Sequence, residues 1–112
     1  MTTGTGHVLT VSDATFERRV IGAGTPVLVE FGAAWCPPCR ALAPILEQLS
    51  QEFQGRLTVA TVDTDESPRA AASLGIMGLP TLVLYKDGAP VERFIGFQPK
   101  AKLLAKITPH LA

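Results

Sequence analysis

The segment Val27-Leu28-Val29-Glu30-Phe31 limits the possible folds of this chain most, because four of its five residues are apolar. A strand with one face in water alternates apolar and polar residues, whereas a strand covered on both faces is apolar nearly throughout. The segment therefore predicts a central strand in a sheet that carries helices on both faces. It also places the one charged residue of the segment, Glu30, in the interior.

Strand-like and helix-like patterns alternate along the rest of the chain. The expected elements are an edge strand at 8–11, a helix that Ser12 caps and that buries Phe16, Val20 and Ile21, the strand at 27–31, a helix at 37–53 kinked at Pro44, a strand at 57–62, a short helix capped by the Ser67 hydroxyl, strands at 81–85 and 91–94, and a last helix opened by Pro99.

The order of these elements predicts the fold class. Crossover helices join the early strands, and Asp87-Gly88 is a hairpin turn signal that makes the last two strands antiparallel. We expect an α/β fold with a central mixed β-sheet flanked by helices on both faces, in a single domain over residues 1–112.

Composition excludes several classes of partner. Ten basic and ten acidic residues give a formal charge of zero, so the chain has no excess of positive charge that would attract nucleic acid or an anionic membrane. The chain has no apolar run of the length that a membrane helix needs, and its first residues do not resemble a secretion signal. We expect a soluble, cytoplasmic monomer.

The only two cysteines, Cys36 and Cys39, stand in Trp35-Cys36-Pro37-Pro38-Cys39, where a strand is expected to turn into a helix. Two thiols at this spacing can close into a disulfide and reopen, and a helix N-terminus stabilises a thiolate. With Cys36 at the N-cap and Cys39 at the third helical position, Cys36 is the expected nucleophile and Cys39 the thiol that resolves the mixed disulfide. This chemistry needs no cofactor beyond the Cys36–Cys39 disulfide.

Two other readings of the cysteines stay open from the residues alone. Half of a zinc site is one, although zinc takes four ligands and the only histidines, His7 and His110, lie near the chain ends. A pair of inert buried thiols is the other, and Trp35 with the two prolines argues against it.

The chain resembles the thioredoxin family over nearly its full length. The resemblance rests on separated motifs, namely Val29-Glu30-Phe31, Trp35 to Arg40, Pro44, Val62-Asp63-Thr64-Asp65, Gly75 to Thr81, Lys86-Asp87-Gly88 and Gly96. It implies a thioredoxin fold, dithiol–disulfide exchange on disulfide-containing protein substrates, a cis proline at Pro80 that faces the cysteines, and re-reduction by a thioredoxin reductase.

The resemblance also implies roles for further residues. Glu30 corresponds to the family's proton-relaying carboxylate, so it joins Cys36 and Cys39 as a catalytic candidate. The expected substrate-binding groove consists of Trp35, Pro37, Met77, Gly78, Leu79, Pro80 and Gly96, with no metal ligand. Phe94 and Ile95 are expected to pack within the hairpin, and Arg40 to be a solvated helix residue.

Four positions depart from the family pattern. Pro37 replaces a glycine between the cysteines, and Glu30 replaces the usual aspartate. Thr61 stands where a lysine usually pairs with that carboxylate, and Gly32 where an aromatic residue is common. The missing lysine predicts that burial raises the pKa of Glu30 without compensation.

Three functions fit these features. A general protein-disulfide reductase is the first. A protein-disulfide oxidase or isomerase on the same fold is the second, although neither Pro37 nor Pro38 supplies the histidine of the oxidising relatives. A non-catalytic module that holds a partner in the groove around Trp35 and Met77 is the third.

Overall fold

A five-stranded sheet with the strand order β1-β3-β2-β4-β5 forms the centre of the computed structural model, which describes residues 8–111. The elements in chain order are β1 (Leu9–Thr10), the π-helical turn η1 (Glu17–Ile21), β2 (Val27–Gly32), α1 (Pro37–Glu52), β3 (Thr58–Asp63), α2 (Pro68–Ser73), β4 (Thr81–Lys86), β5 (Ala89–Ile95), α3 (Lys100–Ile107) and the 3₁₀ turn η2 (Thr108–His110).

The strand β2 lies at the middle of this sheet, and all six of its residues are buried. It pairs in parallel with β3, to which α1 connects it, and antiparallel with β4. The sheet is therefore mixed, as the sequence predicts. Its two edges are β1 and β5.

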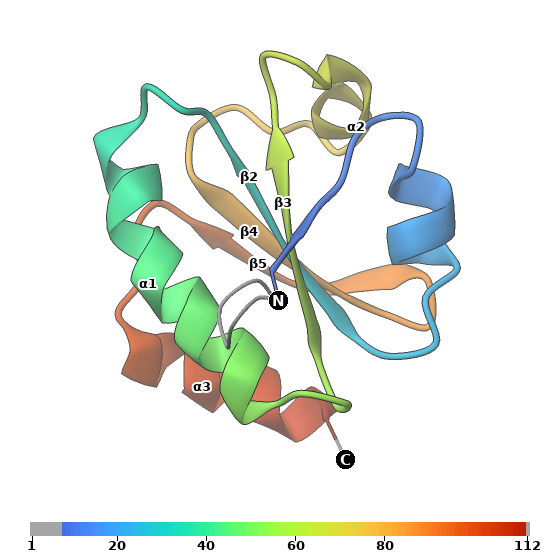
Figure 1. Cartoon of the computed structure of the whole chain (residues 1–112), viewed down its shortest axis with the longest axis vertical. Coiled ribbons are helices and arrows are strands. Elements are labelled where there is room, and N and C mark those ends of the chain that lie inside the picture. Colours follow the sequence, from blue (N-terminus) through green and yellow to red (C-terminus); the bar gives the residue numbers. More distant parts are fainter. Residues whose placement is uncertain (1–7, 112) are drawn as a thin grey trace, which may run out of the picture.

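Helices cover both faces of the sheet (Figure 1). On one face, Leu28 and its neighbours pack against α1 and α3 through Leu42, Leu46, Leu103 and Ile107. On the other face, alternate residues of β2 pack against η1 and α2. Because successive strand residues point to opposite faces, Glu30 and Gly32 share the α1 face with Leu28.

The segment 12–21 differs from the expected helix. Ser12 does not cap a helix; its amide donates to Thr15 Oγ1 at 3.0 Å and its carbonyl accepts from the Thr15 amide at 3.0 Å, which closes a turn. Only Glu17–Ile21 is helical, and Val20 is its one buried residue. Serine and threonine hydroxyls compete in this way with helical hydrogen bonds.

The start of α2 also differs from the prediction. Ser67 occupies the N-cap position but makes no side-chain capping bond. The carboxylate of Asp13 accepts instead from the amides of Arg69 and Ala70, each at 2.9 Å. A residue far away in the sequence therefore caps α2 and ties the 12–16 turn to it.

The hairpin between β4 and β5 forms as expected, with Asp87 and Gly88 at φ values of 54° and 82°. Both values belong to the primed turn that suits two antiparallel strands. Phe94 packs in the core, but Ile95 is 71% exposed, so the expectation that both pack in the hairpin is wrong for Ile95. Neighbouring strand residues cannot face the same side.

Candidate active site

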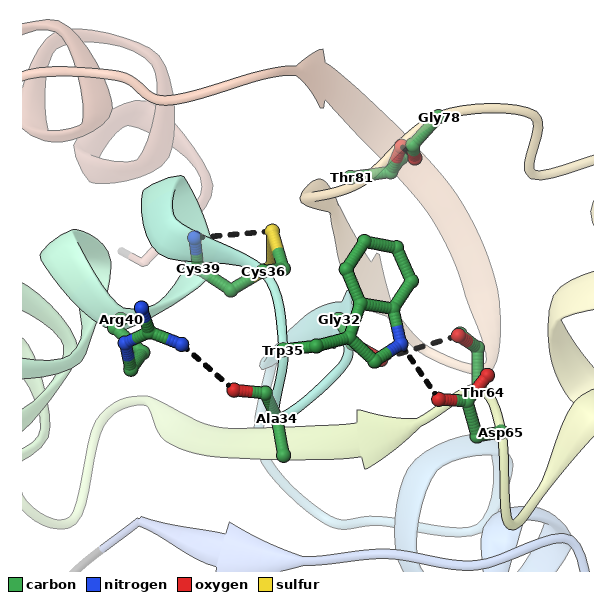
Figure 2. Close-up of a disulfide and its surroundings, with 10 residues drawn as sticks. All are labelled: Gly32, Ala34, Trp35, Cys36, Cys39, Arg40, Thr64, Asp65, Gly78 and Thr81. Atoms are coloured by element: carbon green, nitrogen blue, oxygen red, sulfur yellow. Dashed lines mark hydrogen bonds between the residues drawn. A yellow bond between two sulfur atoms is a disulfide. The ribbon is translucent and has the colours of Figure 1, made fainter.

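The two cysteines lie at the start of α1 and form a disulfide (Figure 2). Cys36 is the N-cap residue, Pro37 and Pro38 occupy the first two helical positions, and Cys39 is the third. The Cys39 amide donates to Cys36 Sγ at 3.3 Å. An amide donor and the positive end of the helix dipole therefore both act on Cys36, which is the arrangement that stabilises a thiolate once the disulfide is reduced.

Accessibility does not distinguish the two cysteine residues in this disulfide state. Cys36 is 3% exposed and Cys39 is 7% exposed, although Cys36 stands at the tip of the helix. The expected division of labour between the thiols therefore depends on the local field and the amide donor. Exposure gives it no support.

Glu30 lies on β2 beneath the start of α1, and it is 6% exposed. Its cross-strand neighbours are Thr61 on β3 and Leu82 on β4, neither of which is charged. The atom Oε2 has no hydrogen-bond partner among the described residues. Burial raises the pKa of Glu30 to about 7, in the direction that the missing lysine predicts.

A pocket of about 220 Å³ connects Glu30 with the disulfide. Its walls include Gly32, Cys39 and Arg40 in addition to Thr61 and Asp63. The pocket gives the carboxyl of Glu30 a route to solvent next to the inner cysteine. A carboxyl with a pKa near neutrality is suited to accept and release protons there.

Two hydrogen bonds hold the loop between β2 and α1. The indole Nε1 of Trp35 donates to Asp65 Oδ2 at 2.7 Å, and the Arg40 guanidinium donates to the carbonyl of Ala34 at 2.9 Å (Figure 2). Arg40 is exposed, as expected, but its side chain braces the loop.

The segment before β4, residues 77–80, forms the second wall of the expected substrate groove, across from the loop between β2 and α1. The Leu79–Pro80 peptide bond is cis, and Leu79 packs against the cluster of Ala33, Cys36 and Cys39. Thr81 Oγ1 donates to the Gly78 carbonyl at 2.7 Å, and the Gly96 amide donates to the Pro80 carbonyl at 2.8 Å.

The exposed residues of the expected groove surround this wall. Met77 is 96% exposed, and Trp35, Pro37 and Gly78 are also exposed. Leu79 thus contacts the cysteines, and Trp35 and Pro37 flank Cys36 in the sequence, while the roles of the groove residues in substrate binding stay predictions.

Among the described residues, no further metal-binding side chains gather around Cys36 and Cys39. Cys36 and Cys39 are bonded to each other, and His110 lies against Glu92 at 3.1 Å. Within residues 8–111, no group of three His, Cys, Asp or Glu side chains is arranged to hold a metal ion. His7 lies outside the described residues. The same part of the chain contains no helix that is both long and apolar enough to cross a bilayer.

A redox-active cysteine pair at a helix N-terminus, beside a buried carboxyl, defines a thiol–disulfide oxidoreductase. Comparison with known proteins agrees, since the sequence model of the thioredoxin family matches residues 7–109. The chain is 46% identical over 103 residues to a thioredoxin of Alicyclobacillus acidocaldarius, covering 92% of this chain and 97% of the relative.

Two further relatives support the same assignment. Thioredoxin 1 of Nostoc sp. is 41% identical over 101 residues, which covers 90% of this chain and 94% of the relative. A thioredoxin of Staphylococcus aureus is 41% identical over 104 residues, covering 93% and 98%. The chain belongs to the thioredoxin family, and it carries out thiol–disulfide exchange.

Sequence reasoning assigned no role to Asp65. The carboxyl ends of the parallel strands β2 and β3 meet at one edge of the sheet, so side chains that follow the two strands come together there. Asp65 follows β3 as Trp35 follows β2. The predicted order of strands therefore already implies that the residues after β2 and after β3 lie close together.

Proposed function

We propose that this protein is a general reductase of disulfides in protein substrates. The observation that carries the proposal is the hydrogen bond from the Cys39 amide to Cys36 Sγ at the N-terminus of α1. A donor that stabilises the Cys36 thiolate supplies the nucleophile that attacks a substrate disulfide. The two prolines between the cysteines offer no group that pushes the site toward oxidation.

The reaction begins on the reduced dithiol. The Cys36 thiolate attacks one sulfur of the substrate disulfide, forms a mixed disulfide and releases the other substrate sulfur as a thiolate, which takes a proton from solvent. Cys39 then loses its proton to the carboxylate of Glu30 and attacks Cys36 Sγ. The second substrate sulfur leaves and is protonated in turn, so that the substrate gains two electrons and the enzyme becomes the disulfide.

Glu30 is a catalytic residue in this proposal because it exchanges the proton of the Cys39 thiol. Its burial on the α1 face, its unpartnered Oε2 and the pocket that it shares with Cys39 support the role. Position 61 holds threonine, so Glu30 has no lysine beside it with which to exchange a proton. The proposal therefore has the carboxyl exchange protons with solvent through this pocket.

Substrate binding falls to the groove around the disulfide. Trp35, Pro37 and Met77 offer exposed surface, while Gly78, Leu79, Pro80 and Gly96 form the opposite wall. The backbone near Leu79 offers an extended substrate segment a short strand-like pairing, which reads peptide geometry and tolerates many sequences.

A thioredoxin reductase restores the dithiol in this scheme, and the protein acts as a monomeric single domain in a reducing cytoplasm. A chain whose only two cysteines are the reacting pair suits that compartment.

Reduction of insulin tests the proposal. The purified chain with a thioredoxin reductase and NADPH should precipitate the insulin B chain, and omission of either component should abolish turnover. A protein that instead oxidises a reduced, unfolded substrate faster than it reduces insulin would be an oxidase. A protein that does neither would be the non-catalytic binding module.

A further inference from the structure

Gly32 stands two residues after Glu30 in β2, so the two residues face α1 side by side. The backbone of Gly32 is that of an ordinary strand residue and does not require glycine. The constraint on this position is the room that a side chain would have. A Cβ at this position would lie 2.8 Å from Glu30 Oε2 and 3.0 Å from Cys39 Sγ.

The distance to Glu30 Oε2 is shorter than real Cβ atoms show, and the distance to Cys39 Sγ is tighter than most of them show, so a side chain at position 32 would have to displace at least one of these two groups. The backbone of Gly32 cannot move aside, because its carbonyl accepts from the Thr64 amide at 2.9 Å and from Thr64 Oγ1 at 3.1 Å. Cys39 is fixed within the first turn of α1. The long side chain of Glu30 is therefore the part that would move.

We propose that Gly32 is a positioning residue that reserves the space in which the Glu30 carboxyl lies beside Cys39 Sγ. The proposal deepens the proton transfer suggested above and rests on it. Glutamate at position 30 needs this space because its side chain is one methylene longer than that of aspartate. Glu30 and Gly32 thus form a matched pair.

Few other charges surround this space. From α1 it is bordered by Arg40, and from β3 by Asp63. Arg40 donates to the Ala34 carbonyl, and Asp63 Oδ1 accepts from the amides of Asp65 and Glu66. The neighbour from β4 is Leu82, which is apolar. Glu30 is therefore the group whose protonation governs Cys39 near neutral pH.

The resolving step can be measured alone with dithiobis(nitrobenzoate). Cys36 attacks this reagent and releases one coloured thiolate. Cys39 then passes its proton to Glu30, attacks Cys36 Sγ and releases the second coloured thiolate. Stopped-flow absorbance across a pH series gives both rates for the full chain.

Gly32→Ala should slow the second release by roughly tenfold or more, since small misplacements of a catalytic group cost this much. The pH midpoint of the second release should also shift, and the first release should change by less than about twofold. Gly24→Ala is the matched control, because a Cβ at Gly24 meets nothing within 4 Å. A Gly32→Ala variant that matches Gly24→Ala in rate and pH profile would overturn the proposal.

A double variant supplies the rescue. Glu30→Asp withdraws the carboxyl from the space that an alanine at position 32 would fill, so Gly32→Ala with Glu30→Asp should resolve at nearly the rate of Glu30→Asp alone. If Gly32→Ala does not fold, the double variant decides. Recovery of folding and of that rate supports the matched pair, and failure of either contradicts it.

Glu30→Gln separates this proposal from the one on which it rests. If Glu30→Gln leaves the second release and its pH profile unchanged, the proton transfer itself is wrong. If Glu30→Gln slows the second release but Gly32→Ala does not, Glu30 acts without help from Gly32, and only the positioning role is wrong.

Discussion

Trp35 and Asp65 join the ends of two parallel strands, with the indole Nε1 donating to Asp65 Oδ2 at 2.7 Å (Figure 2). Trp35 follows β2 and Asp65 follows β3, so the bond fixes an exposed aromatic ring next to the disulfide. The bond holds the indole in place, and we propose that the ring contacts substrate there.

Removal of this acceptor should loosen the ring. In Asp65→Ala the indole loses a bond worth on the order of 1 kcal/mol, so we expect faster quenching of its fluorescence by acrylamide and a few-fold lower kcat/KM on insulin. Trp35 is the only tryptophan, so the signal reports on this ring alone. Asp65→Asn keeps an acceptor and is the control. Equal quenching in wild type and Asp65→Ala would contradict this role.

Glu30 should make stability depend on pH. Burial raises its pKa from 4.5 to about 7, so between these values the folded protein binds more protons than the unfolded chain. The free energy of unfolding therefore falls as pH rises from about 4.5 to 7, and levels off above the folded pKa. Glu30→Gln should be more stable than wild type by about 3 kcal/mol at pH 8 and nearly equal at pH 4.

Urea unfolding at a series of pH values measures this difference, with the exposed Glu66→Gln as control. A stability difference between Glu30→Gln and wild type that stays constant from pH 4 to 8 would show that Glu30 does not titrate in this range.

Asp13 should contribute to stability through α2. Burial raises its pKa, but the amide hydrogen bonds from Arg69 and Ala70, with the charge of Arg69, outweigh burial and lower the pKa overall. The charged carboxylate thus stabilises the fold at neutral pH, and this contribution fades as pH falls toward the lowered pKa. Asp13→Ala should melt at a lower temperature than Asp13→Asn, which keeps an acceptor.

Ser67→Ala is the matched control for Asp13, since the Ser67 hydroxyl makes no capping bond. Thermal denaturation should rank Asp13→Ala as the least stable of the three variants. A larger loss in Ser67→Ala would restore the serine cap that the sequence predicts.

Pro37 should affect the redox potential little. Cys36 Sγ accepts from the Cys39 amide, and a glycine at position 37 would add no donor to this bond. Wild type and Pro37→Gly should therefore both lie near the roughly −270 mV of thioredoxin, within about 30 mV of each other. Equilibration with glutathione buffers measures both. A wild-type potential near the roughly −120 mV of strong oxidants would replace the reductase with an oxidase.

The sequence predicts the parts of the site that depend on local pattern. The apolar run at 27–31 predicts that Glu30 is buried, because a strand that is apolar on both faces has no solvent-exposed side. The Cys36-Pro37-Pro38-Cys39 order predicts the N-cap and the helix start, since proline suits the first turn. The Asp87-Gly88 turn is predicted by its φ preference.

Contacts between distant segments are not predictable in this way. Asp13 replaces Ser67 as the cap of α2 because the tertiary fold brings a better acceptor to the helix. The meeting of Glu30, Gly32 and Cys39 depends on how α1 crosses β2, which no local pattern encodes. The exposure of Ile95, in contrast, follows from strand alternation once Phe94 is in the core.

The proposed reaction depends on Cys36 acting as the attacking thiol and Cys39 as the resolving thiol. Each can be removed singly. Cys39→Ser keeps the attacking thiol but lacks the one that releases the product, whereas Cys36→Ser lacks the thiol at the helix N-cap.

Mass spectrometry of the two variants after incubation with an oxidised protein substrate tests this claim most directly. Cys39→Ser should accumulate a covalent mixed disulfide through Cys36, and Cys36→Ser should trap almost none. Equal trapping by both variants, or trapping by Cys36→Ser alone, would contradict the assignment of the nucleophile.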